Sequence, residues 1–374
     1  MIYFDTASSY PILPEVKQAL AQAFETLYAN SSSSHSLGCE VSEKVNEVRS
    51  LIADEIGAYP SELIFTSGAT ESNNIAIKSL LLGGRLEPDK KHIVTSQIEH
   101  KCIFAICEHL KVFGYDITYV KPNREGIITS ESVLKAIRFD TALVSIMHVN
   151  NELGTINPIG EIGEICKGKQ ILFHSDAAQS FQKLKIDVDE LNIDIMSFSA
   201  HKIGGPKGIG AVFIRDLRNK ELMPVIHGAG QEEGMRGGTV ASPLVEGFRA
   251  AIENFSKYYQ EFSRQNLKEF FVDELNKNGK EFIANGMDNS LPSCLSLTLP
   301  SVDVAVLIRD NESSLCLAQG SACSSRDIEA SHVLTAIGLS REEADKTLRI
   351  SFPLDISKEN ILYLVHKIHR YSLE

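Results

Sequence analysis

The sequence predicts an α/β protein in which a mostly parallel sheet is flanked by helices, followed by a smaller α+β domain. The first observation is that strand-like apolar runs alternate with helix-like ones through the first two-thirds of the 374-residue chain. Repeated strand–helix–strand units build parallel sheets, because a parallel connection needs a long crossover. The second observation is that this alternation stops after Gly238, where a long helical pattern and shorter strand candidates follow.

The elements of the large domain follow from the spacing of apolar residues. The first helix is predicted by side chains that share one helical face, namely Val16, Ala19, Leu20, Ala23, Phe24 and Leu27. Short apolar runs predict six strands, at 63–66, 93–96, 142–147, 171–176, 194–198 and 211–214. A helix is predicted to open near Thr70. A further helix and a hairpin-like region are expected between the second and third strands.

The smaller domain is predicted from a different mixture of elements. These are a long helix over 245–259, strands over 293–299 and 314–317, and a helix from about Ala330. We therefore expect residues 15–250 to form the large domain, and residues 1–14 and 251–374 to form the small one.

Composition places the chain among ordinary soluble globular proteins, with 43% hydrophobic and 23% charged residues. The net charge of −12 argues against a bulk electrostatic attraction to nucleic acid or an anionic membrane. No apolar run approaches about 18 residues and the start lacks a basic region, so we expect neither a membrane span nor a signal peptide. Seven scattered cysteines without a C-x-x-C pair predict a reduced, cytoplasmic protein with no disulfide framework and no metal site.

Lys202 and Asp176 carry the strongest chemical signal. Each ends or follows an apolar strand-like run, although lysine is rarely buried without a partner. Two strands that bring a lysine and an aspartate to one sheet edge meet the needs of pyridoxal 5′-phosphate (PLP). Its aldehyde forms a Schiff base with lysine, and a carboxylate keeps its pyridine nitrogen protonated. The sequence therefore predicts a PLP site at this edge.

The stretch 66–71 follows a predicted strand and opens a helix. Backbone N–H groups at a helix start, together with the positive end of the helix dipole, suit a phosphate. The same residue types also cap helices that bind no ligand, so the stretch alone indicates ordinary helix capping. Beside the predicted PLP lysine it becomes a candidate phosphate site, built from Ala69 and Thr70 and closed by Ser199 and His201.

Three further residues fit a PLP site, and each has an ordinary alternative. His100 follows a predicted strand and could stack on the ring and move protons, or it could be a structural histidine. Asn151 could contact the cofactor hydroxyl and the substrate carboxylate, or it could form a turn. Arg349, between two apolar residues, suits bidentate binding of an amino-acid carboxylate, or it could be a surface arginine on a strand.

Cys323 is the candidate nucleophile. It lies in a stretch of small and polar residues, close to an arginine that favours the thiolate. Most free cysteines are buried hydrophobic residues, and that alternative suits Cys294 and Cys316, which lie in predicted strands. Cys39 is the other cysteine predicted to lie in a loop, and it ranks behind Cys323.

Together these motifs resemble the PLP-dependent cysteine desulfurases, within the class V aminotransferase superfamily of PLP fold type I. The similarity spans nearly the whole chain and depends on the order and spacing of several motifs. They lie at 3–7, 66–73, 149–154, 176–179, 201–202, 234–239 and 320–323. The last motif resembles the subgroup whose catalytic cysteine sits on a long loop, here about 318–328, in the small domain.

The resemblance assigns catalytic roles to three residues. Lys202 would bind the cofactor and then move the substrate proton, and His100 would stack on the ring. Cys323 would attack the sulfur of L-cysteine, so that L-alanine is released and a persulfide stays on Cys323.

The resemblance also assigns the binding residues. Asp176 would pair with the pyridine nitrogen and Gln179 would bind the ring oxygen. Asn151 and Arg349 would hold the substrate carboxylate. The phosphate would be bound by Thr70, Ser199 and His201, with Thr239 contributed by a second subunit.

The expected protein is thus a homodimeric L-cysteine desulfurase that passes sulfur to an acceptor protein, with no direct binding to nucleic acid or membrane. Members of the subgroup carry a longer C-terminal extension that helps to dock an iron–sulfur scaffold protein, and this sequence ends at Glu374. Cluster assembly, tRNA thiolation and DNA phosphorothioation therefore stay open as routes for the sulfur. The alternatives are a selenocysteine lyase, another class V PLP enzyme, or a non-catalytic interaction protein.

Overall fold

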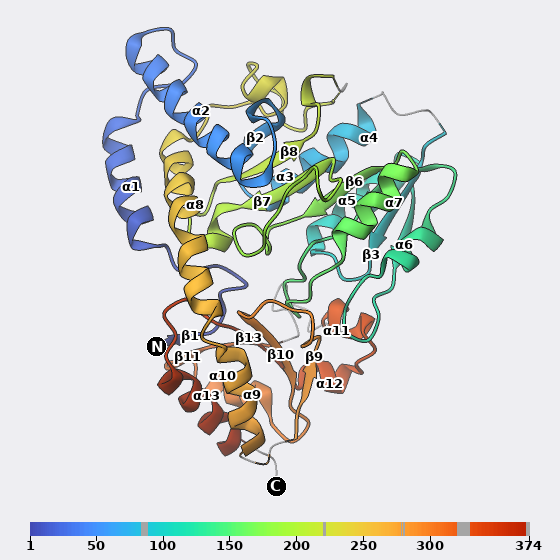
Figure 1. The fold of residues 1–374 in the computed structure, drawn as a ribbon, viewed down its shortest axis with the longest axis vertical. Helices are drawn as coiled ribbons and strands as arrows, with labels where there is room; N and C mark the ends of the chain where they lie inside the picture. Colours follow the sequence, from blue (N-terminus) through green and yellow to red (C-terminus); the bar gives the residue numbers. More distant parts are fainter. Residues whose placement is uncertain (84–88, 220–221, 278, 280, 320–329, 372–374) are drawn as a thin grey trace.

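The computed structural model describes residues 1–83, 89–219, 222–277, 279, 281–319 and 330–371. A seven-stranded sheet with its helices fills the upper part of Figure 1, and a smaller four-stranded sheet lies below it. Among the described residues, no helix combines the length and the apolarity needed to cross a membrane. These described residues also contain no group of three or more His, Cys, Asp or Glu side chains that could hold a metal ion.

The seven-stranded sheet confirms the prediction of a mostly parallel sheet. Its strands, in spatial order, are β2 (Leu63–Thr66), β8 (Gly210–Ile214), β7 (Ile195–Ser199), β6 (Leu172–Asp176), β5 (Thr141–Ser145), β3 (His92–Ser96) and β4 (Asp116–Val120). The five strands from β7 to β4 are parallel to one another, and β8 is antiparallel to both of its neighbours. Every residue of β2, β3, β5, β7 and β8 is buried, because helices cover both faces.

Helices connect these strands and cover the sheet. They are α1 (Pro14–Thr26), α2 (Ser36–Ile56), α3 (Ala69–Asn74), α4 (Leu80–Leu82), α5 (Lys101–Lys111), α6 (Ser130–Ala136), α7 (Ile159–Gly168) and α8 (Ser242–Ser263). A π-helical turn, Ile75–Ser79, joins α3 to α4, and four 3₁₀ turns lie at Pro60–Glu62, Ala200–Ile203, Leu217–Asn219 and Glu232–Gly234. The long helix α8 packs against α1 and α2 and runs down toward the smaller sheet (Figure 1).

The smaller sheet is antiparallel. Its strands, in spatial order, are β12 (Ala318–Gln319), β13 (Thr347–Ser351), β10 (Cys294–Thr298) and β9 (Ile283–Asn285). Beside it, β1 (Ile2–Tyr3) pairs in parallel with β11 (Leu315–Cys316). The helices of this part are α9 (Leu267–Lys277), α10 (Val304–Asp310), α11 (His332–Ala336), α12 (Arg341–Asp345) and α13 (Lys358–Arg370).

Three local predictions differ from the structure. The hairpin-like region before the third predicted strand is instead β4, which pairs in parallel with β3 at the sheet edge. The predicted strand at 314–317 divides between β11 and β12, because the two halves pair with different partners. Phe24, placed on the apolar face of α1, is 63% exposed, whereas Val16 on the same helix is buried. The boundaries of the two domains stay a prediction.

Candidate active site

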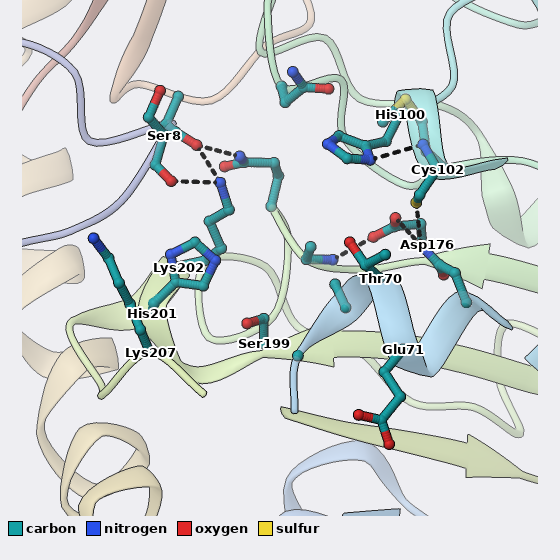
Figure 2. A pocket seen from close by; sticks show the side chains of 18 of the residues that line it. Ser8, Thr70, Glu71, His100, Cys102, Asp176, Ser199, His201, Lys202 and Lys207 are labelled. Atoms are coloured by element: carbon teal, nitrogen blue, oxygen red, sulfur yellow. Dashed lines mark hydrogen bonds between the residues drawn. The ribbon is translucent and has the colours of Figure 1, made fainter. Parts of the chain in front are cut away.

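One pocket, of about 530 Å³, gathers most of the predicted site residues. It lies beyond the carboxyl ends of β3, β5, β6 and β7, where α/β sheets place their ligands. The predicted residues that line it are Ala69, Thr70, His100, Asn151, Asp176, Gln179, Ser199, His201, Lys202 and Arg349. Figure 2 shows Lys202, His100 and Asp176 reaching this hollow from three different elements.

Cys323 lies outside the described residues, so its role as the nucleophile stays a prediction. Gln319, on β12, pairs with Leu348 of β13, which precedes the pocket residue Arg349. The Ser331 hydroxyl donates a hydrogen bond to Glu152, which follows the pocket residue Asn151.

Two other predictions have a different outcome. Thr239 is exposed and does not line the pocket of its own chain. Cys39, predicted to lie in a loop, is an exposed residue of α2. The loop prediction was wrong because α2 begins at Ser36, where the His35 Nδ1 caps the helix by accepting from the Gly38 N–H at 3.1 Å.

Lys202 lies on the 3₁₀ turn that follows β7, and its amine is held by the N-terminal segment. The Lys202 Nζ donates to the Ala7 carbonyl at 2.6 Å and to the Ser8 carbonyl at 2.8 Å (Figure 2). Burial, and then the charge of Arg349, lowers the pKa of Lys202 to about 8. About a tenth of the amine is therefore neutral at pH 7. Sequence reasoning missed Ala7 and Ser8, because a backbone acceptor leaves no signal in residue type.

Asp176 ends β6 and is only 6% exposed. Its Oδ1 accepts from the Ala178 N–H at 2.9 Å, and its Oδ2 accepts from the Asn73 Nδ2 at 2.7 Å. Both donors hold the carboxylate at the pocket wall, and hydrogen bonds to an ionised acceptor are the stronger ones. Asn73 was not predicted as a site residue. The available signal was its place three residues after Thr70, which puts the two residues on one side of α3.

His100 caps the start of α5, and this contact fixes its tautomer. Its Nδ1 accepts from the Cys102 N–H at 3.2 Å, so the ring proton lies on Nε2 when the imidazole is neutral. Burial lowers the pKa of His100, an effect that Asp176 opposes and Lys202 reinforces. The pocket therefore presents a neutral imidazole whose Nε2–H can act as a donor.

The helix start at α3 forms one end of the pocket. Gly68 precedes it with φ of +147°, a conformation in which L side chains are strained. A Cβ at this position would meet the Ser199 Oγ at 3.4 Å, so glycine keeps this corner open. His201 lies nearby, and burial followed by the charge of Lys202 lowers its pKa to about 4. Lys207, which sequence reasoning missed, also lines this pocket and supplies a cation.

Arg349 reaches the pocket from β13, and its guanidinium donates hydrogen bonds to other residues of the chain. Its Nη2 donates to the Asp5 carboxylate and to the Ser8 hydroxyl, both at 2.7 Å. Its Nη1 donates to the Asn151 carbonyl at 3.2 Å, while its buried Nε–H has no partner among the described residues. The guanidinium thus contacts the Asp5 carboxylate through one nitrogen, and bidentate binding of a substrate carboxylate stays a prediction.

Comparison with known proteins agrees with this geometry. The family described as aminotransferase class V matches residues 2–364. The mitosomal cysteine desulfurase of Encephalitozoon cuniculi is 40% identical, over 99% of this chain and 88% of its own length. The cysteine desulfurase IscS of Rickettsia prowazekii is 41% identical, over 98% of this chain and 90% of its own.

A solved structure supports the same assignment. SspA in complex with cysteine superposes with a TM-score of 0.85 at 44% identity, covering 94% of this chain and 99% of that one. The family match, over residues 2–364, includes the strands of both sheets. The chain therefore belongs to the class V aminotransferase family and, within it, to the cysteine desulfurases.

Proposed function

We propose that this protein converts L-cysteine to L-alanine with PLP as cofactor and keeps the sulfur as a persulfide on Cys323. The observation that carries the proposal is the composition of one pocket. It brings together an amine of lowered pKa on Lys202, a doubly hydrogen-bonded carboxylate on Asp176 and a helix start at Ala69. These are an anchor for an aldehyde, a partner for a pyridine nitrogen and a binding site for a phosphate.

The donors and cations at one end of the pocket suit the phosphate of PLP. The first N–H groups of a helix have no partner within the helix, so those of α3 are free to bind an anion. The Ser199 hydroxyl, the His201 imidazole and the Lys207 ammonium surround the same end of the pocket. Gly68 keeps a Cβ away from Ser199, which leaves room for phosphate oxygens.

When bound, PLP supplies an electron sink that stabilises negative charge at the Cα of an amino acid. The chain supplies the proton movements around it. Lys202 Nζ can take a proton because burial and Arg349 lower its pKa, so that part of the amine is unprotonated near neutral pH. His100 can donate from Nε2, since Nδ1 is occupied as an acceptor. Asp176 would place a negative charge beside the pyridine nitrogen and keep that nitrogen protonated.

The N-terminal segment places Gln179 beside the amine. The Ala7 carbonyl accepts from both Lys202 Nζ, at 2.6 Å, and Gln179 Nε2, at 2.8 Å, so the two nitrogens are neighbours. In PLP the ring hydroxyl lies on the carbon next to the one that bears the aldehyde. A ligand whose aldehyde meets Lys202 therefore brings its ring oxygen toward the Gln179 amide.

The substrate carboxylate is assigned to Arg349 and Asn151. Arg349 now contacts the Asp5 carboxylate at 2.7 Å. The incoming carboxylate therefore competes with Asp5 or binds the Nε–H, which has no partner among the described residues.

The sulfur of the substrate is then transferred to Cys323. In this step the Cys323 thiolate would form a bond to the substrate sulfur, the substrate C–S bond would break, and its electron pair would go to the carbon skeleton. Protonation at Cβ then gives L-alanine, and the persulfide stays on Cys323.

The direct test gives purified protein L-cysteine and a thiol reductant, and measures L-alanine and sulfide in the same sample. We expect equal amounts of the two products. Lys202→Ala should lose the visible absorbance of the bound cofactor. Cys323→Ser should keep that absorbance and lose alanine formation, whereas the exposed control Cys39→Ser should keep both. A Cys323→Ser protein that forms alanine and loads an acceptor at the wild-type rate contradicts the proposal.

We also propose a homodimer in which Thr239 completes the phosphate site of the partner subunit. The support is that Thr239 is exposed and absent from its own pocket, while Arg236 on the same segment pairs with Glu71 at the pocket at 2.8 Å. A heterodimer of a Lys202→Ala chain and a Thr239→Ala chain should regain one intact site and half of the wild-type activity. If Thr239 acts within its own chain, both sites stay impaired.

The acceptor of the sulfur and the compartment are the remaining proposals. We propose a protein acceptor, because a persulfide is a reactive group that needs a thiol or a bound ligand to receive it. Six described cysteines are free, which supports a reducing compartment such as the cytoplasm. Cell fractionation tests the location, and transfer of labelled sulfur to co-purified proteins identifies the acceptor.

A further inference from the structure

The orientation of the Gln179 side-chain amide is fixed at both of its ends. Its Nε2 donates to the Ala7 carbonyl at 2.8 Å, and its Oε1 accepts from the Lys183 Nζ at 3.2 Å. A carbonyl can only accept and an ammonium group can only donate. The two contacts therefore require the same orientation, with the amide oxygen toward Lys183 and the NH₂ group toward the pocket.

Lys183 is an unusual residue for this position. Its side chain is half-buried, and no carboxylate in the described part of the chain lies within ion-pair distance of it. Its ammonium lies over the Tyr10 ring, 5.3 Å from the centroid, and borders a second cavity of about 260 Å³. Burial, and then the charge of Lys202, lowers the pKa of Lys183 to about 7. A buried cation without a counter-ion costs stability, so the contact with Gln179 is its main compensation.

We propose that Lys183 is a positioning residue that keeps the NH₂ group of Gln179 directed at the ring oxygen of PLP. The inference rests on the proposed function, since it needs PLP in the pocket. One N–H of the amide is used by Ala7, which leaves the second N–H for a ligand. If the amide turned over, its oxygen would face the ring oxygen, and two acceptors would repel each other.

Lys183 is the stronger of the two determinants. A hydrogen bond from a charged donor is stronger than one between neutral groups, so the ammonium form of Lys183, which predominates below its pKa of about 7, orients the amide more strongly than the Ala7 carbonyl does. The Ala7 carbonyl is moreover shared with the Lys202 amine. Without Lys183, the amide loses its main orienting contact, and the ring oxygen of bound PLP would lose an oriented donor.

The test compares Lys183→Met with the matched control Lys185→Met. Lys185 lies two residues along, and its side chain is 80% exposed in an ion pair with Glu190. Two quantities are measured, the Kd of the apoprotein for PLP and the midpoint of the pH titration of the absorbance of the PLP-bound protein. Lys183→Met should raise the Kd about fivefold, which is about 1 kcal/mol. It should raise the titration midpoint by about 0.7 of a pH unit, because the ionised ring oxygen is less stabilised.

Two further variants separate positioning from a general structural effect. Lys183→Arg also presents only donors, so it should stay within about twofold of the wild type in both quantities. In a Gln179→Leu background, Lys183→Met should change neither quantity further, because the residue acts through the amide. If Lys183→Met has its full effect in that background, or has no effect in the wild type, the positioning role is refuted. If the wild type binds no PLP, the proposed function fails first, and this inference fails with it.

Discussion

Replacing Asn73 by alanine tests whether the second support of Asp176 matters for the cofactor. Asn73 is fully buried on α3, and its Nδ2 donates to the Asp176 Oδ2 at 2.7 Å. Among the described residues, Asn73→Ala leaves that carboxylate with one donor, the Ala178 N–H at 2.9 Å. A hydrogen bond to an ionised acceptor contributes about 1.5–3 kcal/mol. We expect a large part of this energy to be lost from PLP binding, since the carboxylate is then less well oriented.

The expected change in affinity is about tenfold, which corresponds to about 1.4 kcal/mol. The effect on the stability of the apoprotein should be smaller. The Asn73 Oδ1 is buried without a hydrogen-bond partner among the described residues, and such a group costs about 1–3 kcal/mol. Its removal therefore offsets most of the hydrogen bond that is lost, and the melting temperature of the apoprotein should change little.

The assay titrates the apoprotein with PLP and follows the absorbance of the bound form, with thermal unfolding of the apoprotein measured in parallel. The control is Asn74→Ala, the neighbouring asparagine, whose Nδ2 donates to the Thr70 carbonyl within the same helical segment at 2.9 Å. Asn74→Ala should leave the Kd within about twofold of the wild type. An Asn73→Ala protein with wild-type affinity and an unchanged melting temperature would show that Asp176 needs no second donor.

Three further predictions concern pH and the backbone. The rate at which apoprotein incorporates PLP should rise with pH around a midpoint near 8, the pKa of Lys202, and Arg349→Gln should move this midpoint upward in a stopped-flow pH series. An unchanged midpoint in Arg349→Gln would contradict the assignment of Arg349 as a cause of the lowered pKa of Lys202. Burial raises the pKa of Glu99 from 4.5 to about 8, so between these pH values the folded chain holds more protons than the unfolded chain and loses stability as pH rises. Glu99→Gln removes this loss, and its melting temperature relative to the wild type should increase by a few degrees between pH 5 and pH 8; a constant difference refutes the assignment. Gly68→Ala should cost about 1–3 kcal/mol of stability in denaturant titration because of the positive φ, and it should weaken PLP binding; wild-type values for both would show that the backbone relaxes.

The sequence was sufficient for six of the seven strands of the large sheet and for most of the side chains that line the pocket. Strand ends are informative because parallel strands bring their carboxyl ends to one edge, and this placed Asp176, Ser199 and Lys202 together. The parallel edge strand β4 was missed because a short half-buried strand has no strong periodicity. Contacts between distant segments were also missed, among them the Ala7 carbonyl and Lys183.

The reasons for these omissions are physical. The acceptor at Ala7 is a backbone atom, so any residue type could provide it. Lys183 lies only four residues after Gln179, but its place over the Tyr10 ring depends on how segments far apart in the sequence pack. The competition between Asp5 and a substrate carboxylate for Arg349 likewise depends on the folded position of the N-terminal segment.

The N-terminal segment also has a consequence for the order in which the protein is made. The Ser351 hydroxyl bonds to the Phe4 carbonyl, 347 positions earlier in the sequence, and Asp5 pairs with Arg349. During synthesis the segment that holds the Lys202 amine leaves the ribosome before β11 and β13, and its contacts with Arg349 and Ser351 form only after β13 has emerged. A nascent chain that stops before β13 should therefore fail to retain the cofactor, because Arg349 and part of the support of the N-terminal segment are then missing.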